Sequence, residues 1–348
     1  MTADNPALAP LDEVLAGWAG ADDGRAAVAA TISALADAGR QIAGLVARGA
    51  IDGGLAAVRR SSDTGDDQKE LDVRANEIII AALERAPVAV FGSEEMDHAV
   101  AMTSGAPLAV AVDPLDGSSN IDTNVSIGTI FSVLPDIPGG TPLLQPGANQ
   151  RAAGYILYGP QTLLVVTVGD GTDVYALDAG SGRFLLTRRR VAIPRRAGEF
   201  AINGSNLRHW DPVVRQYIAD CLAGSEGPRG RDFNTRWIAS MVAEAHRILT
   251  RGGIYLYPGD VRRGYERGRL RLVYEANPIG FLVEQAGGGC STGYARMLDI
   301  VPETLHQRVP LIFGSADEVD HVERMHREPP AAGAEHSPLF ATRGLLRA

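Results

Sequence analysis

The chain has few cysteines, no block of basic residues and no long apolar run. Cys221 and Cys290 are the two cysteines in 348 residues, which excludes a disulfide framework. The 42 acidic residues outnumber the 33 basic ones, and the formal net charge of −9 argues against nucleic acid as a partner. No stretch is long enough to span a membrane, and the first residues lack the basic and apolar segments of a signal peptide. These absences predict a cytoplasmic protein with no nucleic-acid or membrane partner.

The apolar share of 45% is sufficient for a large core, and the length is enough for two ordinary domains. Apolar spacing predicts helices over 25–48 and 68–85, a strand over 88–91, and mostly strands between 127 and 186. The second half alternates helices and strands, and the Pro- and Arg-containing segment 191–199 indicates a junction. We therefore expect an N-terminal α/β domain over 1–196, a C-terminal α/β domain over 197–327 and a disordered tail over 328–348.

Three capping signals mark helix starts in the second half. Asp211 with Pro212 pairs an N-cap residue with a proline at the first helical position, and Asn277–Pro278 repeats the pattern. Ser315 and Glu318 have the spacing of a capping box for the last helix. Each signal predicts that a helix begins at that point.

The most informative segment is 113–120, DPLDGSSN, which follows the apolar run 109–112. The run predicts a buried strand, and two carboxylates, Asp113 and Asp116, come directly after it. Carboxylates suit Mg²⁺, and the small residues that follow let backbone amides approach a phosphate closely. The segment therefore offers both halves of metal-assisted phosphate chemistry. The alternative is an ordinary polar turn after a core strand.

Further carboxylates lie at predicted strand ends or helix starts, where α/β folds place functional groups. Glu275 ends the apparent strand 270–274 and precedes the helix start at Asn277. The others are Asp66, Asp72, Glu94 and Glu95. If these groups converge with the two aspartates, each like-charged pair at ~4 Å costs about 4 kcal/mol at an effective dielectric near 20. Divalent cations would then be required; the alternative is that several are solvated surface carboxylates.

Several blocks of the chain match a known family in the same order. They are 64–72 (TGDDQKELD), 93–95 (SEE), 113–122 (DPLDGSSNID) and 270–278 (LRLVYEANP). On these motifs, which span about 39–323, the chain resembles class I fructose-1,6-bisphosphatase in the lithium-sensitive, metal-dependent sugar phosphatase superfamily. The resemblance implies an α/β fold of five layers, an α-β-α-β-α sandwich with mixed sheets, and a homotetramer.

The same resemblance implies an activity. It is Mg²⁺-dependent hydrolysis of the 1-phosphate of fructose 1,6-bisphosphate to fructose 6-phosphate and phosphate, in gluconeogenesis or the Calvin cycle. A dual or preferential sedoheptulose-1,7-bisphosphatase is the alternative. An inositol monophosphatase-type enzyme and a catalytically dead sugar-phosphate-binding protein are further alternatives, which a phosphate-release assay separates.

The resemblance also implies roles for particular residues. Two or three Mg²⁺ ions, with Mn²⁺ as a substitute, would be held by Asp66, Glu94, Glu95, Asp113, Leu115 (through its carbonyl), Asp116 and Glu275. Activation of water would fall to Asp66, Asp72 and Glu95. The substrate would be bound by Asp116, Gly117, Ser118, Ser119, Asn203, Arg236, Trp237, Tyr255, Leu256, Tyr257 and Arg269, with Arg236 reaching a neighbouring subunit's site.

Departures from the family pattern concern the 6-phosphate pocket and AMP. Arg269 stands where many members have Lys, Asn206 replaces a usual Tyr, and Trp237 replaces the Tyr after the arginine. Since Arg and Lys bind phosphate differently and Trp has no hydroxyl, the pocket is expected to be reshaped. The segment 106–108 lacks the Lys–Tyr pair that many relatives use for AMP, which predicts weak or absent inhibition by AMP.

Overall fold

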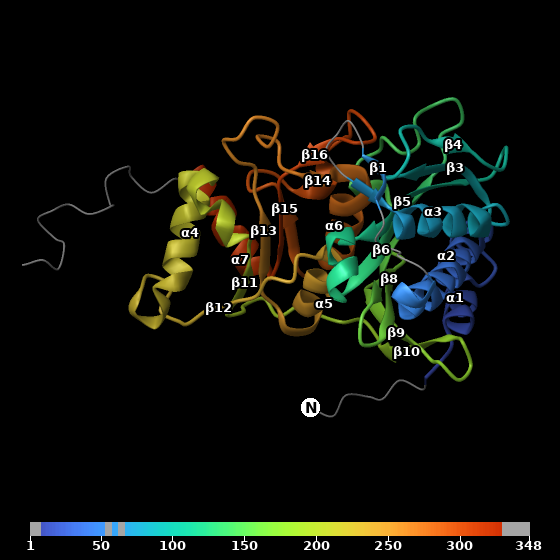
Figure 1. Ribbon diagram of the computed structural model, residues 1–348, viewed down its shortest axis with the longest axis horizontal. Coiled ribbons are helices and arrows are strands. Elements are labelled where there is room, and N and C mark those ends of the chain that lie inside the picture. The colour runs from blue at the N-terminus through green and yellow to red at the C-terminus, as the bar shows by residue number, and fades with distance from the viewer. Residues whose placement is uncertain (1–7, 53–57, 62–66, 329–348) are drawn as a thin grey trace, which may run out of the picture.

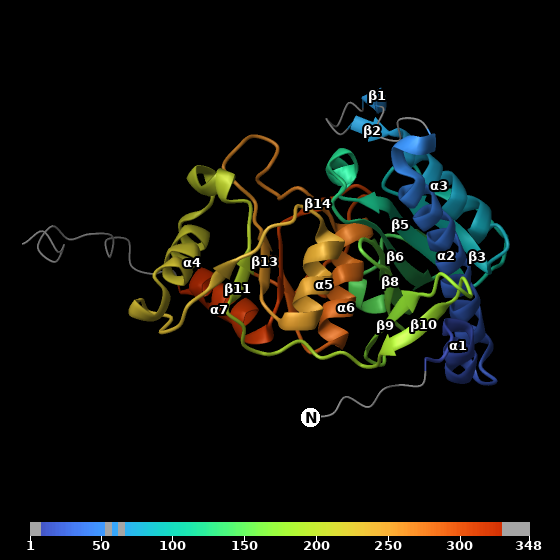
Figure 2. The same cartoon turned by 60° about the horizontal axis from the view of Figure 1, so that its bottom comes forward.

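A computed structural model describes residues 8–52, 58–61 and 67–328. Helices and sheets alternate along the long axis of the molecule, as Figures 1 and 2 show. One outer layer consists of α1 (Leu11–Ala19), α2 (Asp23–Arg48) and α3 (Glu70–Leu83); the middle layer of α5 (Met241–Arg251) and α6 (Asn277–Gln285); and the other outer layer of α4 (Pro212–Leu222) and α7 (Ala316–Arg327). A sheet fills each of the two intervals between these helical layers.

The larger sheet has eight strands in the order β10-β9-β8-β7-β6-β5-β3-β4. These strands are β3 (Val88–Ser93), β4 (Val100–Ala101), β5 (Leu108–Asp116), β6 (Ile127–Pro135), β7 (Ala152–Tyr158), β8 (Thr162–Thr167), β9 (Thr172–Leu177) and β10 (Phe184–Arg188). β3 and β5 run parallel and the other neighbouring pairs antiparallel, so the sheet is mixed. Every residue of β5 is buried, which makes it a rigid support for whatever it carries.

The smaller sheet has five strands in the order β12-β11-β13-β17-β15. They are β11 (Glu199–Ala201), β12 (Asn234–Thr235), β13 (Ile254–Tyr257), β15 (Gly289–Ser291) and β17 (Leu311–Gly314). β11 runs parallel to both of its neighbours, whereas β17 runs antiparallel to β13 and β15. Two short ribbons pair β1 (Val58–Ser61) with β2 (Asp67–Lys69) and β14 (Leu270–Arg271) with β16 (Arg308–Val309).

Apolar cores fill the intervals between the layers. Ile32 of α2 and Phe131 of β6 belong to the core between the first helices and the larger sheet. Tyr155, which is fully buried, lies in the core that α5 and α6 share with both sheets. Phe200 and Tyr217 lie in the core between the smaller sheet and α4 and α7. These cores lie between five layers, and the expected mixed α-β-α-β-α sandwich is confirmed.

Most expected elements are present, and two local predictions are wrong. The helices at 25–48 and 68–85 and the strands between 127 and 186 are confirmed, as is the N-cap of Asp211, whose side chain accepts a hydrogen bond from the Val214 amide at 2.9 Å. Ser315 and Glu318 form no capping box. The Ser315 hydroxyl instead donates to the Pro194 carbonyl at 2.6 Å, and Glu318 binds Tyr217, Arg229 and Arg231.

The second wrong prediction concerns the segment before α6. The strand β14 ends at Arg271, and residues Leu272–Ala276 form a π-helical turn that runs straight into α6. Asn277 is therefore not an N-cap, and Glu275 lies on a helical turn, not at a strand end. In the described residues no helix combines the length and apolar character needed to cross a membrane.

Candidate active site

An irregularity in β5 brings two aspartates to one side of the sheet. Asp113 pairs with Ile130 of β6 and Asp116 with Gly128, so three steps along β5 oppose two along β6. Residues three apart on a regular strand point to opposite faces, and one extra residue restores the same face. The Pro114 carbonyl at this bulge accepts a hydrogen bond from the Thr129 hydroxyl at 2.8 Å. The DPLD sequence therefore makes a bulge that aligns two carboxylates.

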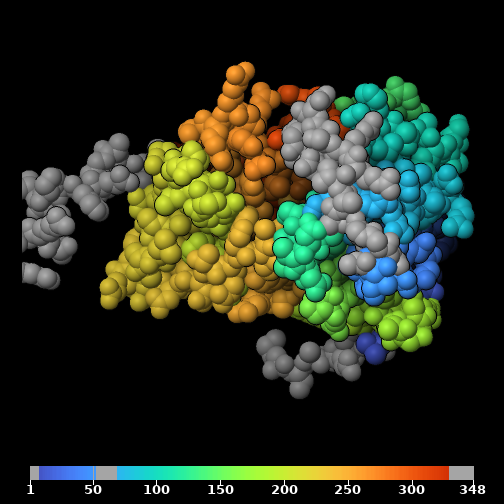
Figure 3. Space-filling model, in the orientation of Figure 1, coloured from blue at the N-terminus to red at the C-terminus, as the bar shows by residue number. Residues whose placement is uncertain are grey.

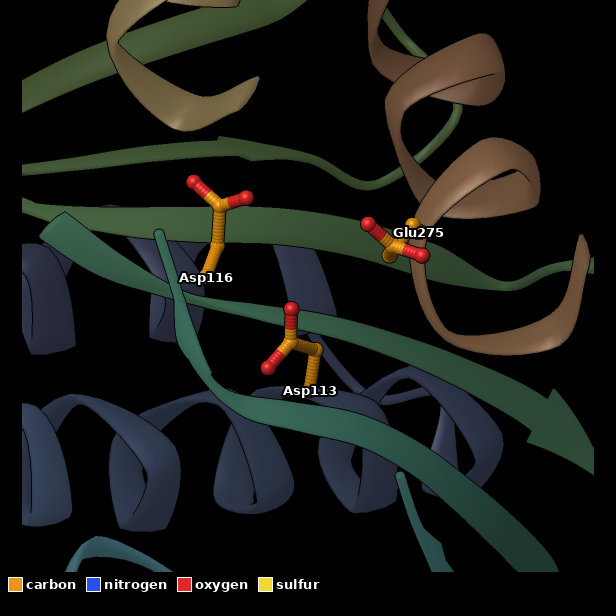
Figure 4. A group of neighbouring side chains, drawn as sticks. All are labelled: Asp113, Asp116 and Glu275. Atoms are coloured by element: carbon orange, nitrogen blue, oxygen red, sulfur yellow. The ribbon is translucent and has the colours of Figure 1, made fainter. Parts of the chain in front are cut away.

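The π-helical turn supplies the third carboxylate from the other half of the chain. Carboxylate oxygens of Asp113, Asp116 and Glu275 lie within 4.8 Å of one another, and all three residues are buried. Figure 4 shows the two aspartates on β5 facing Glu275 on the helical turn. π-Helical turns are rare and are frequent at functional sites. Here the turn carries a carboxylate to the edge of the β5 bulge.

Asp116 is held by the N-terminus of α5. Its carboxylate accepts hydrogen bonds from the Ser240 hydroxyl at 2.9 Å, the Met241 amide at 3.2 Å and the Val242 amide at 3.0 Å. Burial raises the pKa of Asp116, and these hydrogen bonds oppose that rise. The partial positive charge of a helix N-terminus favours a carboxylate there. Asp116 thus joins the larger sheet to a helix of the middle layer.

The remaining carboxylates are destabilised by burial and by one another. Burial, and next the charges of Glu94, Asp116 and Glu275, raise the pKa of Asp113 well above its ordinary value. Burial and Glu94 likewise raise the pKa of Glu275, although the Arg271 amide donates a hydrogen bond to it. The Arg271 guanidinium, which is also buried, donates to Glu94 at 3.2 Å. The cluster carries more negative charge than this arginine compensates.

Asp72, Glu94 and Glu95 lie next to this cluster. Glu94 and Glu95 follow β3, the parallel neighbour of β5, and both act electrostatically on Asp113. Asp72 is buried in the first turn of α3, where one oxygen accepts from the Lys69 amide at 2.8 Å and the other has no hydrogen-bond partner among the described residues. Burial raises the pKa of Asp72 to about 6. Asp66 lies outside the described residues, so its place in the site stays a prediction.

The segment after Asp116 forms a tight turn against α5. Gly117 has a φ of +78°, and a Cβ there would lie 3.0 Å from that of Ser240, so only glycine fits without strain. A 3₁₀ turn, Ser118–Thr123, follows it. Lys69 donates to the Ser118 carbonyl at 2.9 Å and to Asp122 at 3.0 Å. Ser119 is exposed, and Gly117 and Ser118 are partly so, which leaves this turn open to a ligand.

Aromatic residues connect the carboxylates with the smaller sheet. Trp237 stacks on Tyr255 with ring centroids 5.9 Å apart, and Tyr257 lies 6.3 Å from Tyr255. Tyr255 is buried, and after burial and Tyr257 the charges of Asp116 and Glu275 contribute to raising its pKa. Its ring is therefore close to both the acidic cluster and Tyr257. The Leu256 side chain points to the other face of the sheet, in the outer core, so it can reach a ligand only through its backbone.

The side chains of Trp237, Tyr255 and Tyr257 form an aromatic wall, and the other predicted substrate residues are spread around it. Asn203 caps the 3₁₀ turn Gly204–His209 and accepts a hydrogen bond from the Ser205 hydroxyl at 2.5 Å. Arg269 is exposed and lies against the ring of Tyr265, 4.7 Å from its centroid. Arg236 is exposed and lies 3.7 Å from Glu199 at the far end of β11. Arg236 and Arg269 thus both lie at the surface, Arg236 paired with Glu199 and Arg269 against Tyr265.

Sequence reasoning missed two residues of the site. Arg271 is a lone arginine in the apolar stretch 270–276, and a charged residue at such a position is a signal of a buried ion pair. Ser240 precedes an amphipathic segment and carries an ordinary N-cap signal. That its hydroxyl binds Asp116, 124 positions away, has no local signal in the sequence.

The donor set fits a hard divalent cation. Mg²⁺ takes oxygen ligands at 2.0–2.1 Å in an octahedron, and the three clustered carboxylates offer oxygens at a mutual spacing compatible with one shared ion. Buried Asp72 has one oxygen without a hydrogen-bond donor among the described residues, and an ordered water would supply that donor. Without a cation, the burial of this many carboxylates is unfavourable. The residues present therefore suit metal binding.

Two family models match successive parts of the chain. The fructose-1-6-bisphosphatase N-terminal domain matches residues 19–189, and the C-terminal domain matches residues 193–327. A class 1 fructose-1,6-bisphosphatase of Rhodopseudomonas palustris is 54% identical over 95% of this chain and 96% of its own length. Another, of Nitrobacter hamburgensis, is 55% identical over 97% of this chain and 98% of its own.

A solved structure agrees with these matches. The crystal structure of Leishmania major fructose-1,6-bisphosphatase in holo form aligns with a TM-score of 0.85 at 33% identity, and the alignment covers 92% of this chain and 100% of that one. The five layers with their two mixed sheets are those of the sugar phosphatase fold. Within that class, the chain belongs to the fructose-1,6-bisphosphatase family.

Proposed function

We propose that this protein is a metal-dependent fructose-1,6-bisphosphatase, which hydrolyses the 1-phosphate of fructose 1,6-bisphosphate to fructose 6-phosphate and phosphate. The single observation that carries the proposal is the cluster of three buried carboxylates, Asp113, Asp116 and Glu275, beside a glycine turn suited to a phosphate. The full-length identity to named fructose-1,6-bisphosphatases supports fructose over sedoheptulose bisphosphate as the sugar. The reaction is a step of gluconeogenesis; a role in the Calvin cycle is a further proposal.

Carboxylates of the pocket would hold two or three Mg²⁺ ions, or Mn²⁺. The proposed ligands are Asp66, Glu94, Glu95, Asp113, the Leu115 carbonyl, Asp116 and Glu275. When bound, divalent cations stabilise charge on phosphate oxygens and make water more acidic. The amides of the turn after Asp116, at Gly117, Ser118 and Ser119, would bind the 1-phosphate, since backbone N–H groups at a turn suit an anion.

Asp72 is the proposed proton acceptor for the attacking water. One of its oxygens is fixed by the Lys69 amide, and the other, which has no partner in the described part of the chain, would hold water. Burial raises the pKa of Asp72 to about 6, and a general base is most effective when its pKa is near the working pH. Glu95, and Asp66 from outside the described residues, would assist it.

The sugar and the 6-phosphate would lie along the aromatic wall of the smaller sheet. The proposed contacts are Asn203, Trp237, Tyr255, the Leu256 backbone, Tyr257 and Arg269. The outward position of Arg236 supports a further proposal, that it reaches the site of a neighbouring subunit in a homotetramer. We also propose a cytoplasmic location and two domains that meet between residues 196 and 197.

Phosphate release from fructose 1,6-bisphosphate tests the function. We expect turnover with Mg²⁺, none with excess EDTA, and a loss of at least about 100-fold in kcat for Asp113→Asn. Asp97→Asn is the matched control, because Asp97 is an exposed aspartate in the segment that follows β3, the parallel neighbour of β5. Wild-type turnover by Asp113→Asn would contradict the metal assignment. A higher kcat/KM on sedoheptulose 1,7-bisphosphate would contradict the choice of sugar.

A further inference from the structure

Arg262 is fixed by three neighbours at the edge of the smaller sheet. Asp260 accepts from its Nε at 3.0 Å and also binds its Nη2. Asn206 accepts from the same Nη2 at 3.2 Å. The guanidinium carbon lies 4.8 Å from the ring centroid of Tyr265. The hydrogen bonds to Asp260 and Asn206 hold the Nε–Nη2 edge of the guanidinium, Tyr265 covers a face, and within the described chain the Nη1 group donates no hydrogen bond.

A second arginine lies against the same ring. The guanidinium carbon of Arg269 is 4.7 Å from the Tyr265 centroid, and among the described residues it has no carboxylate partner. Two cations at one ring repel each other, and Asp260 neutralises only one of them. The segment 258–269 contains four arginines against Asp260 and Glu266, in a chain whose net charge is −9. Positive charge is therefore concentrated where the protein as a whole is acidic.

This pair of arginines adjoins the proposed distal end of the substrate pocket. Asn206 belongs to the 3₁₀ turn capped by Asn203, and the amide of Val261 donates to the His209 carbonyl at 3.2 Å, which docks the loop on that turn. The hydrogen bonds to Asp260 raise the pKa of Arg262 most, and Tyr265 and then Tyr257 add smaller contributions. In Figure 3 the surface is hollowed between the orange segment of the second half and the green turn that follows β5.

We propose that Arg262 binds the distal phosphate of the substrate, together with Arg269, and takes the place of the tyrosine that Asn206 replaces. This inference rests on the proposed function. The Nη1 group of Arg262 donates to a phosphate oxygen, while Asp260 and Asn206 hold the guanidinium in position. Arg263, the next residue, is exposed and has no such contacts among the described residues.

An arginine at this position makes the pocket select for a second phosphate. Arg262, Arg269 and Asp260 together leave one net positive charge, which attracts a phosphate dianion, and charge-assisted hydrogen bonds of guanidinium to phosphate are stronger than those of a neutral phenol. A substrate with a neutral hydroxyl at the distal end leaves the arginines unsatisfied. Arg262 therefore contributes to the binding of bisphosphates and contributes nothing to the turnover of sugar 1-phosphates.

The test compares fructose 1,6-bisphosphate with fructose 1-phosphate, which lacks the distal phosphate. For Arg262→Met, which keeps most of the apolar stem, we expect KM for the bisphosphate to rise about 10- to 100-fold with kcat changed less than about threefold. We expect kcat/KM for fructose 1-phosphate to stay within about twofold of wild type. Arg262→Lys restores part of the bisphosphate affinity, because it keeps the charge but loses the fork. Arg263→Met is the matched control and changes neither substrate.

Two results overturn the inference. One is an unchanged KM of Arg262→Met for the bisphosphate; the other is an equal loss on both substrates, which indicates general damage to the pocket. Binding of fructose 6-phosphate to metal-free protein, followed by calorimetry, gives a second measure that needs no turnover, and Arg262→Met should weaken it by the same factor. If the wild type hydrolyses neither sugar phosphate, the proposed function is wrong. The binding of fructose 6-phosphate still tests Arg262 in that case, because it needs no turnover.

Discussion

Replacement of Asp113 by Asn should make the metal-free protein more stable, although it destroys the metal site. Asp113 oxygens lie within 4.8 Å of those of Asp116 and Glu275, and all three residues are buried. Two unit charges at that distance repel by about 3.5 kcal/mol at an effective dielectric of 20. Asparagine has the same shape and removes this repulsion. Its side-chain oxygen can still accept the hydrogen bond that the Leu115 amide donates to Asp113 at 2.9 Å.

The magnitude has an upper limit, because the wild-type protein can avoid repulsion by binding a proton. Protonation of an aspartate with an ordinary pKa of 3.8 costs about 4 kcal/mol at pH 7, at 1.36 kcal/mol per pKa unit. We therefore expect Asp113→Asn to raise the free energy of unfolding by about 1–4 kcal/mol in EDTA. At about 2 °C per kcal/mol in a chain of this size, Tm should rise by several degrees.

The pH dependence gives a check on the sign. Burial and neighbouring carboxylates raise the folded-state pKa of Asp113 above its unfolded value, so the wild-type protein gains stability as pH falls through the folded pKa toward about 4. The advantage of Asp113→Asn should shrink over that range. The assay is thermal and urea unfolding in EDTA at pH 7 and pH 5, and again in Mg²⁺, where wild type should become the more stable.

The control for this experiment is Asp97→Asn, which should change stability by less than about 0.5 kcal/mol, as for most exposed positions. A metal-free Asp113→Asn protein that unfolds more easily than wild type would refute the reasoning. It would mean that Asp113 is stabilised by partners in the folded state and is not under electrostatic stress. Such a result would also weaken the metal assignment, since a relaxed carboxylate needs no cation.

Three further predictions concern other parts of the molecule. Glu318→Gln should lower the free energy of unfolding by about 3 kcal/mol in urea, because it leaves the partly buried charges of Arg229 and Arg231 without their buried carboxylate partner, and should leave kcat within twofold. Burial lowers the pKa of His246 to about 4 from 6.5, so the wild type should lose about 2 kcal/mol more than His246→Gln between pH 7 and pH 5; equal losses would contradict the buried neutral imidazole. AMP up to millimolar concentration should leave turnover nearly unchanged, and strong inhibition at micromolar AMP would contradict the interpretation of residues 106–108.

Local sequence patterns were sufficient for most of the helices and strands, and they singled out the three carboxylates that the structure brings together. Asp113 and Asp116 follow an apolar run, and that run is the buried strand β5. Their common orientation depends on the bulge opposite Gly128 and Ile130 of β6, which is a property of strand pairing. Glu275 was expected at a strand end, because the residues before it are apolar and β-branched or aromatic. Tertiary packing places them in a π-helical turn instead.

Long-range partners explain why the capping box failed. Ser315 and Glu318 have the right spacing, yet each finds a partner from another element. Ser315 accepts from the Gly253 amide at 3.1 Å and donates to the Pro194 carbonyl. The Glu318 carboxylate is buried against two arginines and the Tyr217 hydroxyl, whose hydrogen bond is 2.8 Å long. A charged partner binds a buried carboxylate more strongly than a backbone amide does, so the capping box does not form.

The unusual backbone conformations near the acidic cluster serve to join the two halves of the chain. The bulge at Asp113 and the left-handed Gly117 belong to the larger sheet, whereas Ala239, with a φ of +59°, precedes α5. Such conformations persist only where surrounding contacts hold them. Asn120 donates to the carbonyls of Ile238 and Ala239 at 3.2 and 3.3 Å, and Asp116 binds the next residues. The same hydrogen bonds therefore position a proposed metal ligand and fasten α5, so removing Asp116 alters the segment that carries Trp237 as well as the charge of the cluster.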